Sequence, residues 1–327
     1  MKNFNSEYLA KNTTQSVNGL FSIMVFCRHF KQYVVFDDNL VNRVFLSLDG
    51  FFGQLIVVMF FFYSGYGIFR QIQNSSDGTY IRSFLRKRLL PVWISFAVCI
   101  CLFIITDSIT GRINDFSLME IILAFTGWTS IGNSNWFMFD TFALYLLVFL
   151  SFSYSGSMSD QRRLLLFTAM TAVLAALLFF VKSSIWWNTI FCFPLGMWYA
   201  FFKENIDQSI KNSSRYWILS ASLIVVFVPL WMIRYKFGGL PHVALSVVFA
   251  FIVLFITMKV DIANRGLGFL GKHLFSIYML QRIVFTAYSR LFTDIYLYFA
   301  CSLITTIVVA TLYDRILNNL IIRIKRL

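Results

Sequence analysis

One histidine and four other polar side chains lie within or beside the first apolar segment of the chain. Gln15, Asn18, Ser22, His29 and Gln32 are separated by 3, 4, 7 and 3 residues. At 3.6 residues per turn, Asn18 and His29 fall on one face of a helix, about 16.5 Å apart along its axis. A neutral imidazole can accept a proton near pH 7, so His29 is a candidate general base. The alternative is a structural histidine whose ring nitrogens are satisfied by a neighbouring helix.

Two more ionisable residues lie in later apolar segments. Asp140 follows the run NSNWFMF, and Arg282 follows Tyr278 and Gln281. Ionisable groups inside a membrane are costly, and by default they mark functional sites. Counting from the expected outer ends of their segments places His29, Asp140 and Arg282 in the same half of the bilayer. A meeting of these three side chains is therefore one prediction of the sequence.

A basic run, YIRSFLRKRLLPVW, comes before another apolar segment. Its four cations are denser than membrane orientation requires, and they are Arg82, Arg86, Lys87 and Arg88. Guanidinium groups bind phosphate oxygens in pairs, so the run suits a phosphate-rich ligand. The alternative is contact with anionic lipid headgroups, which attract juxtamembrane cations.

The composition indicates that these residues are carried by membrane helices. Of the 327 residues, 58% are apolar and only 13% are charged, whereas soluble domains average about 25% charged residues. The formal net charge of +13 is interpreted as orienting charge at helix ends rather than as a nucleic-acid surface. The five cysteines lie in apolar runs and do not pair with a histidine cluster, so the sequence predicts no metal site.

The apolar runs predict an all-α polytopic bundle of about ten membrane-spanning helices. A shorter run, 117–128, is expected to be re-entrant or interfacial. With the N-terminus inside, 19 of the 28 Lys and Arg residues fall on the cytoplasmic side, which predicts both termini in the cytoplasm. The chain is expected to be one domain over 1–327, with a polar segment 1–16 and a basic tail 314–327. The ten predicted spans are 17–36, 52–70, 89–107, 136–154, 163–181, 185–202, 215–233, 240–258, 268–288 and 292–313.

Six short phrases then occur in a recognisable order over about residues 15–290. They are VNGLFSIMVFCRHF with Asn18, Gly19 and His29; FFYSGYGIF with Ser64, Gly65 and Tyr66; FLRKRLLP; NWFMFDTFALYL with Asn135, Trp136 and Tyr145; FPLGMWYAFF with Gly196; and LGFLGKHLFSIYMLQ with Gly271, Lys272, Ser276 and Tyr278. Together they resemble the acyltransferase-3 family of integral membrane acyltransferases, many of which O-acetylate bacterial surface polysaccharides. Two positions depart from the family pattern: Asn18 stands where the family has Arg or Lys, and Gln281 stands where it often has His.

The resemblance implies a membrane O-acyltransferase that moves an acetyl group from cytoplasmic acetyl-CoA to a hydroxyl of a surface or lipid-linked glycan. His29 would be the essential, catalytic histidine. Asn18, also catalytic, would polarise or position the donor where the family uses a cation, and Asp140 would orient His29 or pair with Arg282. The cations of the basic run, Arg82, Arg86, Lys87 and Arg88, would meet the phosphates of acetyl-CoA. The substrate-binding set would be Ser64, Tyr66, Asn135, Trp136, Tyr278, Gln281 and Arg282.

Two other functions fit the same residues. In a transporter or exporter of a glycan or small solute, His29, Asp140 and Arg282 would be coupling groups. In a catalytically silent component of a glycan assembly complex, Asn18 and Gln281 would mark lost activity. In each case the expected partners are the lipid bilayer and a glycan or solute, with no nucleic acid, in a bacterial inner or plasma membrane. The sequence carries no indication of the oligomeric state.

Overall fold

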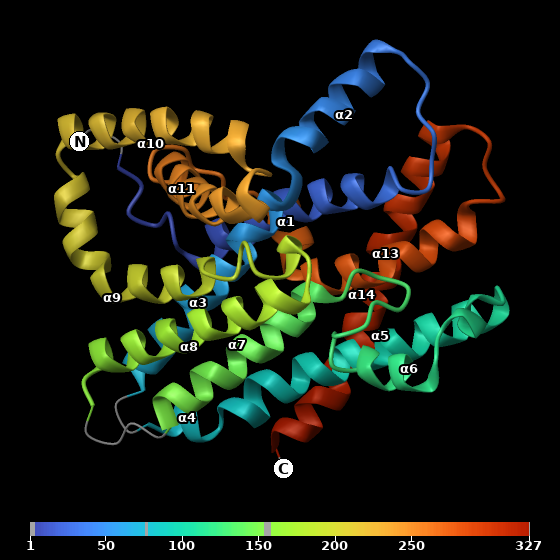
Figure 1. Cartoon of the computed structure of the whole chain (residues 1–327), viewed down its shortest axis with the longest axis horizontal. Coiled ribbons are helices and arrows are strands. Elements are labelled where there is room, and N and C mark those ends of the chain that lie inside the picture. The colour runs from blue at the N-terminus through green and yellow to red at the C-terminus, as the bar shows by residue number, and fades with distance from the viewer. Residues whose placement is uncertain (1–3, 76–77, 154–157, 327) are drawn as a thin grey trace. The chain divides into compact units, whose positions relative to one another are not determined.

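Helices are the regular structure of every described part of the chain. The computed structural model describes residues 4–75, 78–153 and 158–326, and no strand occurs among them. Figure 1 shows the helices in chain order. The prediction of an all-α membrane protein is confirmed, because seven stretches of helix are long and apolar enough to cross a bilayer. Those stretches are Leu40–Asn74, Leu85–Ile109, Trp136–Ser153, Asp160–Val181, Ser213–Ile233, Phe237–Thr257 and Ile295–Asn319.

Each of the other three predicted spans is also helical but less apolar or shorter. They correspond to α1 (Lys11–Phe30), α9 (Cys192–Ile210) and α13 (Leu274–Tyr288). The polar face of α1 lowers its mean hydropathy, α9 ends in the charged run KENID, and α13 has 15 residues. Membrane spans are recognised in a sequence by their high mean hydropathy, and polar side chains within a span lower that hydropathy.

The described residues of segments 1–14, 57–85 and 143–262 form one compact unit, here called unit 1. Its helices are α3 (Val58–Asn74), α4 (Thr79–Arg82), α8 (Asp160–Val181), α9, α10 (Ser213–Ile233) and α11 (Leu240–Thr257). Gly65 faces the backbone carbonyl of Phe193, and Gly196 faces the carbonyl of Phe62. A Cβ atom at either glycine would overlap these carbonyls, so small residues allow α3 and α9 to pack backbone to backbone.

The described residues of segments 15–56, 86–142 and 263–327 form unit 2. It holds most of α1, together with α2 (Leu40–Phe52), α5 (Leu90–Ile109), α6 (Leu118–Ala124), α12 (Arg265–Lys272), α13 and α14 (Ile295–Arg326); α7 (Trp136–Ser153) begins in it. The basic tail predicted for 314–327 continues α14 as helix as far as Arg326.

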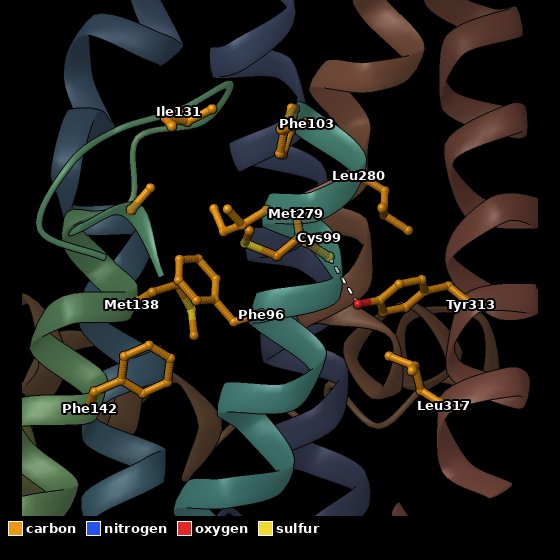
Figure 2. Packing of buried hydrophobic residues seen from close by; sticks show 12 residues of the cluster. Phe96, Cys99, Phe103, Ile131, Met138, Phe142, Met279, Leu280, Tyr313 and Leu317 are labelled. Carbon is orange, nitrogen blue, oxygen red and sulfur yellow. Dashed lines mark hydrogen bonds between the residues drawn. The ribbon is translucent and has the colours of Figure 1, made fainter. Parts of the chain in front are cut away.

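Aromatic and aliphatic side chains from α5, α7, α13 and α14 form a core within unit 2, shown in Figure 2. Phe96 and Phe142 pack edge to face with ring centroids 5.4 Å apart. The thiol of Cys99 lies 3.1 Å from the hydroxyl of Tyr313, and that hydroxyl also donates to the backbone carbonyl of Ser95. This core fixes α13 against α5 and α14, and α13 carries three of the predicted site residues.

Three short α-helices of the described residues lie between the predicted spans, and they are α2, α4 and α6. The run expected to be re-entrant contains α6, which begins with a capping box in which Ser117 and Glu120 satisfy each other's backbone N–H groups. The backbone N–H of Ser117 lowers the pKa of the Glu120 carboxyl. The helix α2 lies between the predicted spans 17–36 and 52–70, and α4 lies between the predicted spans 52–70 and 89–107. Neither helix was predicted.

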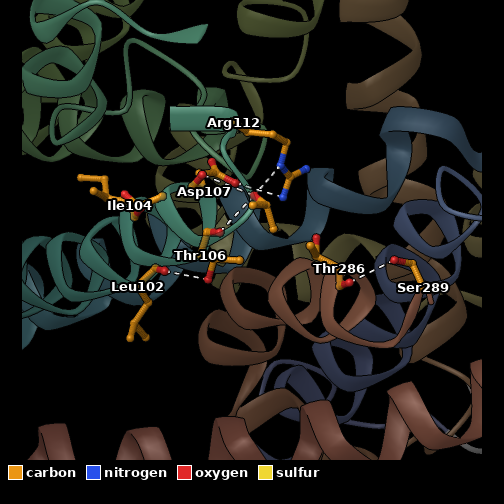
Figure 3. A network of polar contacts seen from close by, with 9 residues as sticks. Leu102, Ile104, Thr106, Asp107, Arg112, Thr286 and Ser289 are labelled. Carbon is orange, nitrogen blue, oxygen red and sulfur yellow. Dashed lines mark hydrogen bonds and ion pairs between the residues drawn. The ribbon is translucent and has the colours of Figure 1, made fainter. Parts of the chain in front are cut away.

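A polar network closes the end of α5, as Figure 3 shows. Asp107, which is buried, forms an ion pair with Arg112 at 3.0 Å. The hydroxyl of Thr106 donates to the carbonyl of Leu102 one turn earlier. These contacts lie where the helix ends and the chain turns through Gly111, whose φ is +80°.

Candidate active site

The polar face of α1 packs against α12 and α13 within unit 2. Near its start, the hydroxyl of Ser16 accepts a hydrogen bond from the backbone N–H of Asn264 at 3.0 Å. Gly19 lies directly under the carbonyl of Leu267, where a side chain would not fit. The polar face of α1 is therefore in contact with protein at both ends of the helix, here through Ser16 and Gly19 and at its other end through His29.

His29 lies at the last turn of α1 and meets α13. Its Nδ1 is 2.8 Å from the side-chain amide nitrogen of Gln281. The ring lies tilted against Tyr278, with centroids 5.7 Å apart. His29 is 9% exposed and Gln281 is fully buried. Just beyond α1, the guanidinium of Arg282 donates to the side-chain oxygen of Gln32 at 2.8 Å. Gln281 and Arg282, which are neighbours in α13, therefore bind His29 and Gln32, which belong to the same series of polar residues.

The turn before α7 reaches the same stretch of α13. The hydroxyl of Tyr278 donates to the carbonyl of Ser134 at 2.6 Å, and the amide of Asn133 donates to the carbonyl of Tyr278 at 3.1 Å. Asn135 is fully buried, and its amide nitrogen binds the carbonyl of Thr129. Hydrogen bonds thus link this turn, which ends where α7 begins at Trp136, to the part of α13 that contacts His29 of α1.

Two predicted catalytic residues keep polar atoms without partners. Asp140 is fully buried in α7, and neither carboxyl oxygen forms a hydrogen bond with any described residue. The expected bonds from Asp140 to His29 or Arg282 are therefore not formed in this structure. Asn18 lies on α1 with its buried Oδ1 atom unpartnered among the described residues. Buried polar groups are normally hydrogen-bonded, so such atoms mark positions where a substrate or water would bind.

Two predicted substrate-binding residues belong to unit 1. The hydroxyl of Ser64 lies 3.2 Å from that of Tyr145, and Tyr66 is half-buried on the same helix, α3. Tyr145 also packs against Phe84 with centroids 5.7 Å apart. Within unit 1, these contacts join α3, α7 and Phe84, which belongs to the first part of the basic run.

The four predicted donor-binding cations are all exposed, and they divide between the two units. Arg82 ends α4 in unit 1, whereas Arg86, Lys87 and Arg88 lie in a π-helical turn, Leu85–Leu89, whose basic residues belong to unit 2. Single π-helical turns within α-helical segments are rare and are frequent at functional sites.

Arg82 lines a pocket of about 480 Å³ in unit 1, whose second guanidinium comes from Arg163. Asp160 lies 3.4 Å from Arg163. No sequence spacing connects Arg163 with the basic run, so nothing in the sequence indicates that the two guanidinium groups share a pocket. The described residues that line the pocket are Ile72, Gln73, Ser75, Gly78, Tyr80, Ile81, Arg82, Phe152, Ser153, Asp160 and Arg163.

Two ionic clusters in unit 2, each built on one buried residue, were not predicted. Asp49 of α2 binds Arg28 at 3.0 Å and also binds Lys31, so α2 is tied to the end of α1. In the second cluster, Asp314 of α14 accepts from Nδ1 of His273 at 2.5 Å and from the hydroxyl of Ser276. The paired residues are 18 to 41 positions apart in the chain. No helical spacing joins them, so only the tertiary fold brings them together.

The second cluster places His273 in contact with α14 inside unit 2. His242 and His273 lie near the starts of the predicted spans 240–258 and 268–288. Both are buried, and His242 makes its side-chain contact with Ser246 in the same helix, at 3.1 Å.

The comparisons with known proteins agree with this architecture. The family model described as an acyltransferase domain matches residues 17–315. No curated protein and no solved structure matches the chain. The match includes α1 with His29 and most of α14, and therefore spans both units. With its apolar helices, the chain is a multi-pass membrane protein, and it belongs to the acyltransferase-3 family of membrane acyltransferases.

Proposed function

We propose that this acyltransferase moves an acetyl group from acetyl-CoA to a hydroxyl of a surface or lipid-linked polysaccharide in a bacterial inner membrane. The observation that carries the proposal is the position of His29. It lies inside the matched acyltransferase domain, at the junction of α1, α13 and the turn before α7. An ionisable side chain so placed in a membrane protein is a functional group by default.

The donor site of this proposal is the pocket that contains Arg82 and Arg163. Two guanidinium groups around a polar pocket of about 480 Å³ fit the chemistry of a nucleotide with several phosphates. Acetyl-CoA would supply a thioester, whose carbonyl carbon is the electrophile. Arg86, Lys87 and Arg88 are exposed and would add to the attraction of a polyanionic donor.

Acyl transfer to a hydroxyl needs a group that manages the hydroxyl proton, a donor to the developing oxyanion, and a way of holding both substrates. His29 and Asp140 are the ionisable residues proposed for the first two tasks. Asn18 would hold the donor along the polar face of α1. Two aromatic residues suit a sugar acceptor: Trp136, which begins α7, and Tyr278 of α13, whose hydroxyl donates to the turn before α7.

The proposal is tested on the host's surface glycan. O-acetyl esters are measured by NMR before and after mild alkali in wild type, a gene deletion, and His29→Ala at matched protein level. We expect the esters to disappear in both mutants. His242→Ala is the matched control, because His242 is also buried in an apolar helix but has no proposed role, and its esters should remain. Esters that persist in the deletion would contradict the proposal.

A second measurement separates the enzyme from a transporter or a silent component. Purified protein is incubated with acetyl-CoA and glycan, and free thiol is followed with time. We expect thiol release that requires His29. Transport of the glycan without thiol release would support a transporter, and neither activity would support a silent component.

A further inference from the structure

We infer that Gln281 holds the neutral His29 ring with its proton on Nε2, and that His29 acts as a hydrogen-bond donor to the acyl carbonyl oxygen rather than as the base. The second half of this inference rests on the proposed acyl transfer, whereas the first half rests on hydrogen bonds alone. It gives a specific role to Gln281, a residue at which this chain departs from the family pattern.

The orientation of the Gln281 amide is set by two acceptors. Its nitrogen lies 3.0 Å from the carbonyl oxygen of Tyr278 and 2.8 Å from Nδ1 of His29. An amide nitrogen donates two hydrogen bonds and accepts none. If the amide were turned over, its oxygen would face the Tyr278 carbonyl, and two acceptors would meet without a proton between them. The nitrogen therefore stays toward both partners, and each receives one N–H.

This orientation determines the tautomer of His29. Since Nδ1 accepts from the Gln281 amide, it carries a lone pair, and the proton of a neutral imidazole is then on Nε2. Nε2 forms no hydrogen bond with any described residue. The ring is also held in place by its packing against Tyr278. The edge of His29 that remains free for a substrate is consequently an N–H donor.

A donor of this kind fits one task of acyl transfer. As the acceptor oxygen bonds to the acyl carbon, negative charge develops on the carbonyl oxygen, and a fixed N–H group stabilises it. A neutral imidazole that polarises a carbonyl is an established use of histidine. In the full step the hydroxyl oxygen bonds to the acyl carbon, the carbon–sulfur bond breaks, and the hydroxyl proton ends on the released thiol. His29 keeps its proton throughout.

The oxygen of the Gln281 amide is a candidate binding atom for the acceptor substrate. Oε1 of Gln281 is buried and has no hydrogen-bond partner among the described residues. A buried carbonyl oxygen is normally satisfied, and the acceptor hydroxyl is a donor of suitable chemistry. Gln281 would then position His29 through its nitrogen and bind the attacking hydroxyl through its oxygen.

The tautomer is measured directly by NMR of protein labelled with ¹⁵N-histidine in nanodiscs. The chain has three histidines, and the His29 signals are identified by their loss in His29→Ala. We expect the wild type to carry the proton on Nε2. In Gln281→Glu the carboxylate accepts from Nδ1, so the proton moves to Nδ1. In Gln281→Leu no side chain bonds to Nδ1, so the His29 proton no longer prefers Nε2 over Nδ1. A wild type with the proton on Nδ1, or an unchanged tautomer in Gln281→Leu, would overturn the assignment.

Activity then separates a donor from a base. If His29 donates through Nε2, Gln281→Glu removes that proton and lowers acyl transfer by about 100-fold, with an unchanged KM for acetyl-CoA. If His29 were the base, the same variant would present an unprotonated Nε2 and would equal or exceed the wild type, which would overturn the donor role. Gln71→Glu makes the same change at an exposed position and should behave as wild type. A wild type without acyl transfer would reject the proposed function, and the NMR result would still decide the tautomer.

Discussion

At the scale of single residues, Asp107 and Asp140 are a natural pair for comparison. Both are buried in apolar helices of unit 2, but Asp107 is paired with Arg112 whereas Asp140 has no hydrogen-bond partner among the described residues. Removing one member of an ion pair destabilises a fold, while removing an unpartnered carboxyl breaks no native contact. The two aspartates should therefore respond differently to the same substitution.

We expect Asp107→Asn to lower the free energy of unfolding by about 1 kcal/mol, since Arg112 is half exposed and water screens the pair. Asp140→Asn should leave the thermal midpoint in detergent unchanged or higher, and should reduce acyl transfer by about 100-fold, as expected for a proton acceptor. Thermal unfolding and thiol release on both variants provide the comparison. A lower midpoint for Asp140→Asn would show that its carboxyl has a structural partner.

The residue types of the site could be predicted from the sequence, but several of their contacts could not. The spacing of Asn18 and His29 is a local property of one helix, so their shared face followed from 3.6 residues per turn. The bond from His29 to Gln281 joins residues 252 positions apart, and no periodicity encodes it. The same holds for Asp314 with His273, and for the failure of Asp140 to reach Arg282, which depends on helix rotation.

At the scale of the elements, the crossing of α1 and α12 positions His29. Gly19 and Gly271 lie face to face, and a Cβ atom at either would overlap the carbonyl of Leu267 or of Gln15. Gly19→Ala and Gly271→Ala should therefore force the helices apart, at a cost of about 1–3 kcal/mol for overpacking, and should reduce acyl transfer. Gly67→Ala is the matched control, because no atom lies within 4 Å of its Cβ position.

Thermal unfolding and thiol release on the three glycine variants check this prediction. In a helix, alanine is favoured over glycine by about 1 kcal/mol, so Gly67→Ala should be as stable as the wild type or more so. Equal stability for Gly19→Ala and Gly67→Ala would mean that the close crossing contributes nothing.

The helix α2 shows where element prediction fails. Its residues include Asn42, Arg43 and Asp49, and nearly all of the helix falls between the predicted spans 17–36 and 52–70, where no helix was expected. The structure ties α2 to α1 through Asp49, which binds Arg28 and Lys31. We expect Asp49→Ala to release α2 and to raise its amide hydrogen exchange, measured over 40–52. Asp38→Ala is the control, because the ion pair of Asp38 with Arg43 is exposed. Faster exchange of α2 in Asp38→Ala but not in Asp49→Ala would contradict the role of the Asp49 ion pairs.

At the scale of the whole molecule, the number of crossings decides the topology. Seven helical stretches are apolar enough to span, and an odd number would place the two ends of the chain on opposite sides of the membrane. Including α1, α9 and α13 gives the ten predicted from the sequence, with both ends inside. The case for α1 and α13 is that their polar groups contact each other, through His29 with Gln281 and Gln32 with Arg282, and are therefore shielded from lipid, which lets both helices cross despite their lower hydropathy. The case for α9 is its backbone-to-backbone packing through Gly65 and Gly196 against α3, which belongs to a stretch that is apolar enough to span.

Single cysteines in a chain whose five native cysteines are replaced provide the measurement. Ser6 and Asn318 are exposed positions near the two ends, and Lys236 lies in the turn between α10 and α11. We expect a membrane-impermeant maleimide to label Ser6→Cys and Asn318→Cys only after the membrane is opened, and Lys236→Cys in intact cells, because the positive-inside bias places both ends in the cytoplasm. If Ser6→Cys and Asn318→Cys were labelled from opposite sides, the number of spans would be odd. Either one or all three of α1, α9 and α13 would then lie outside the bilayer, and His29 could not be an intramembrane group if α1 were among them.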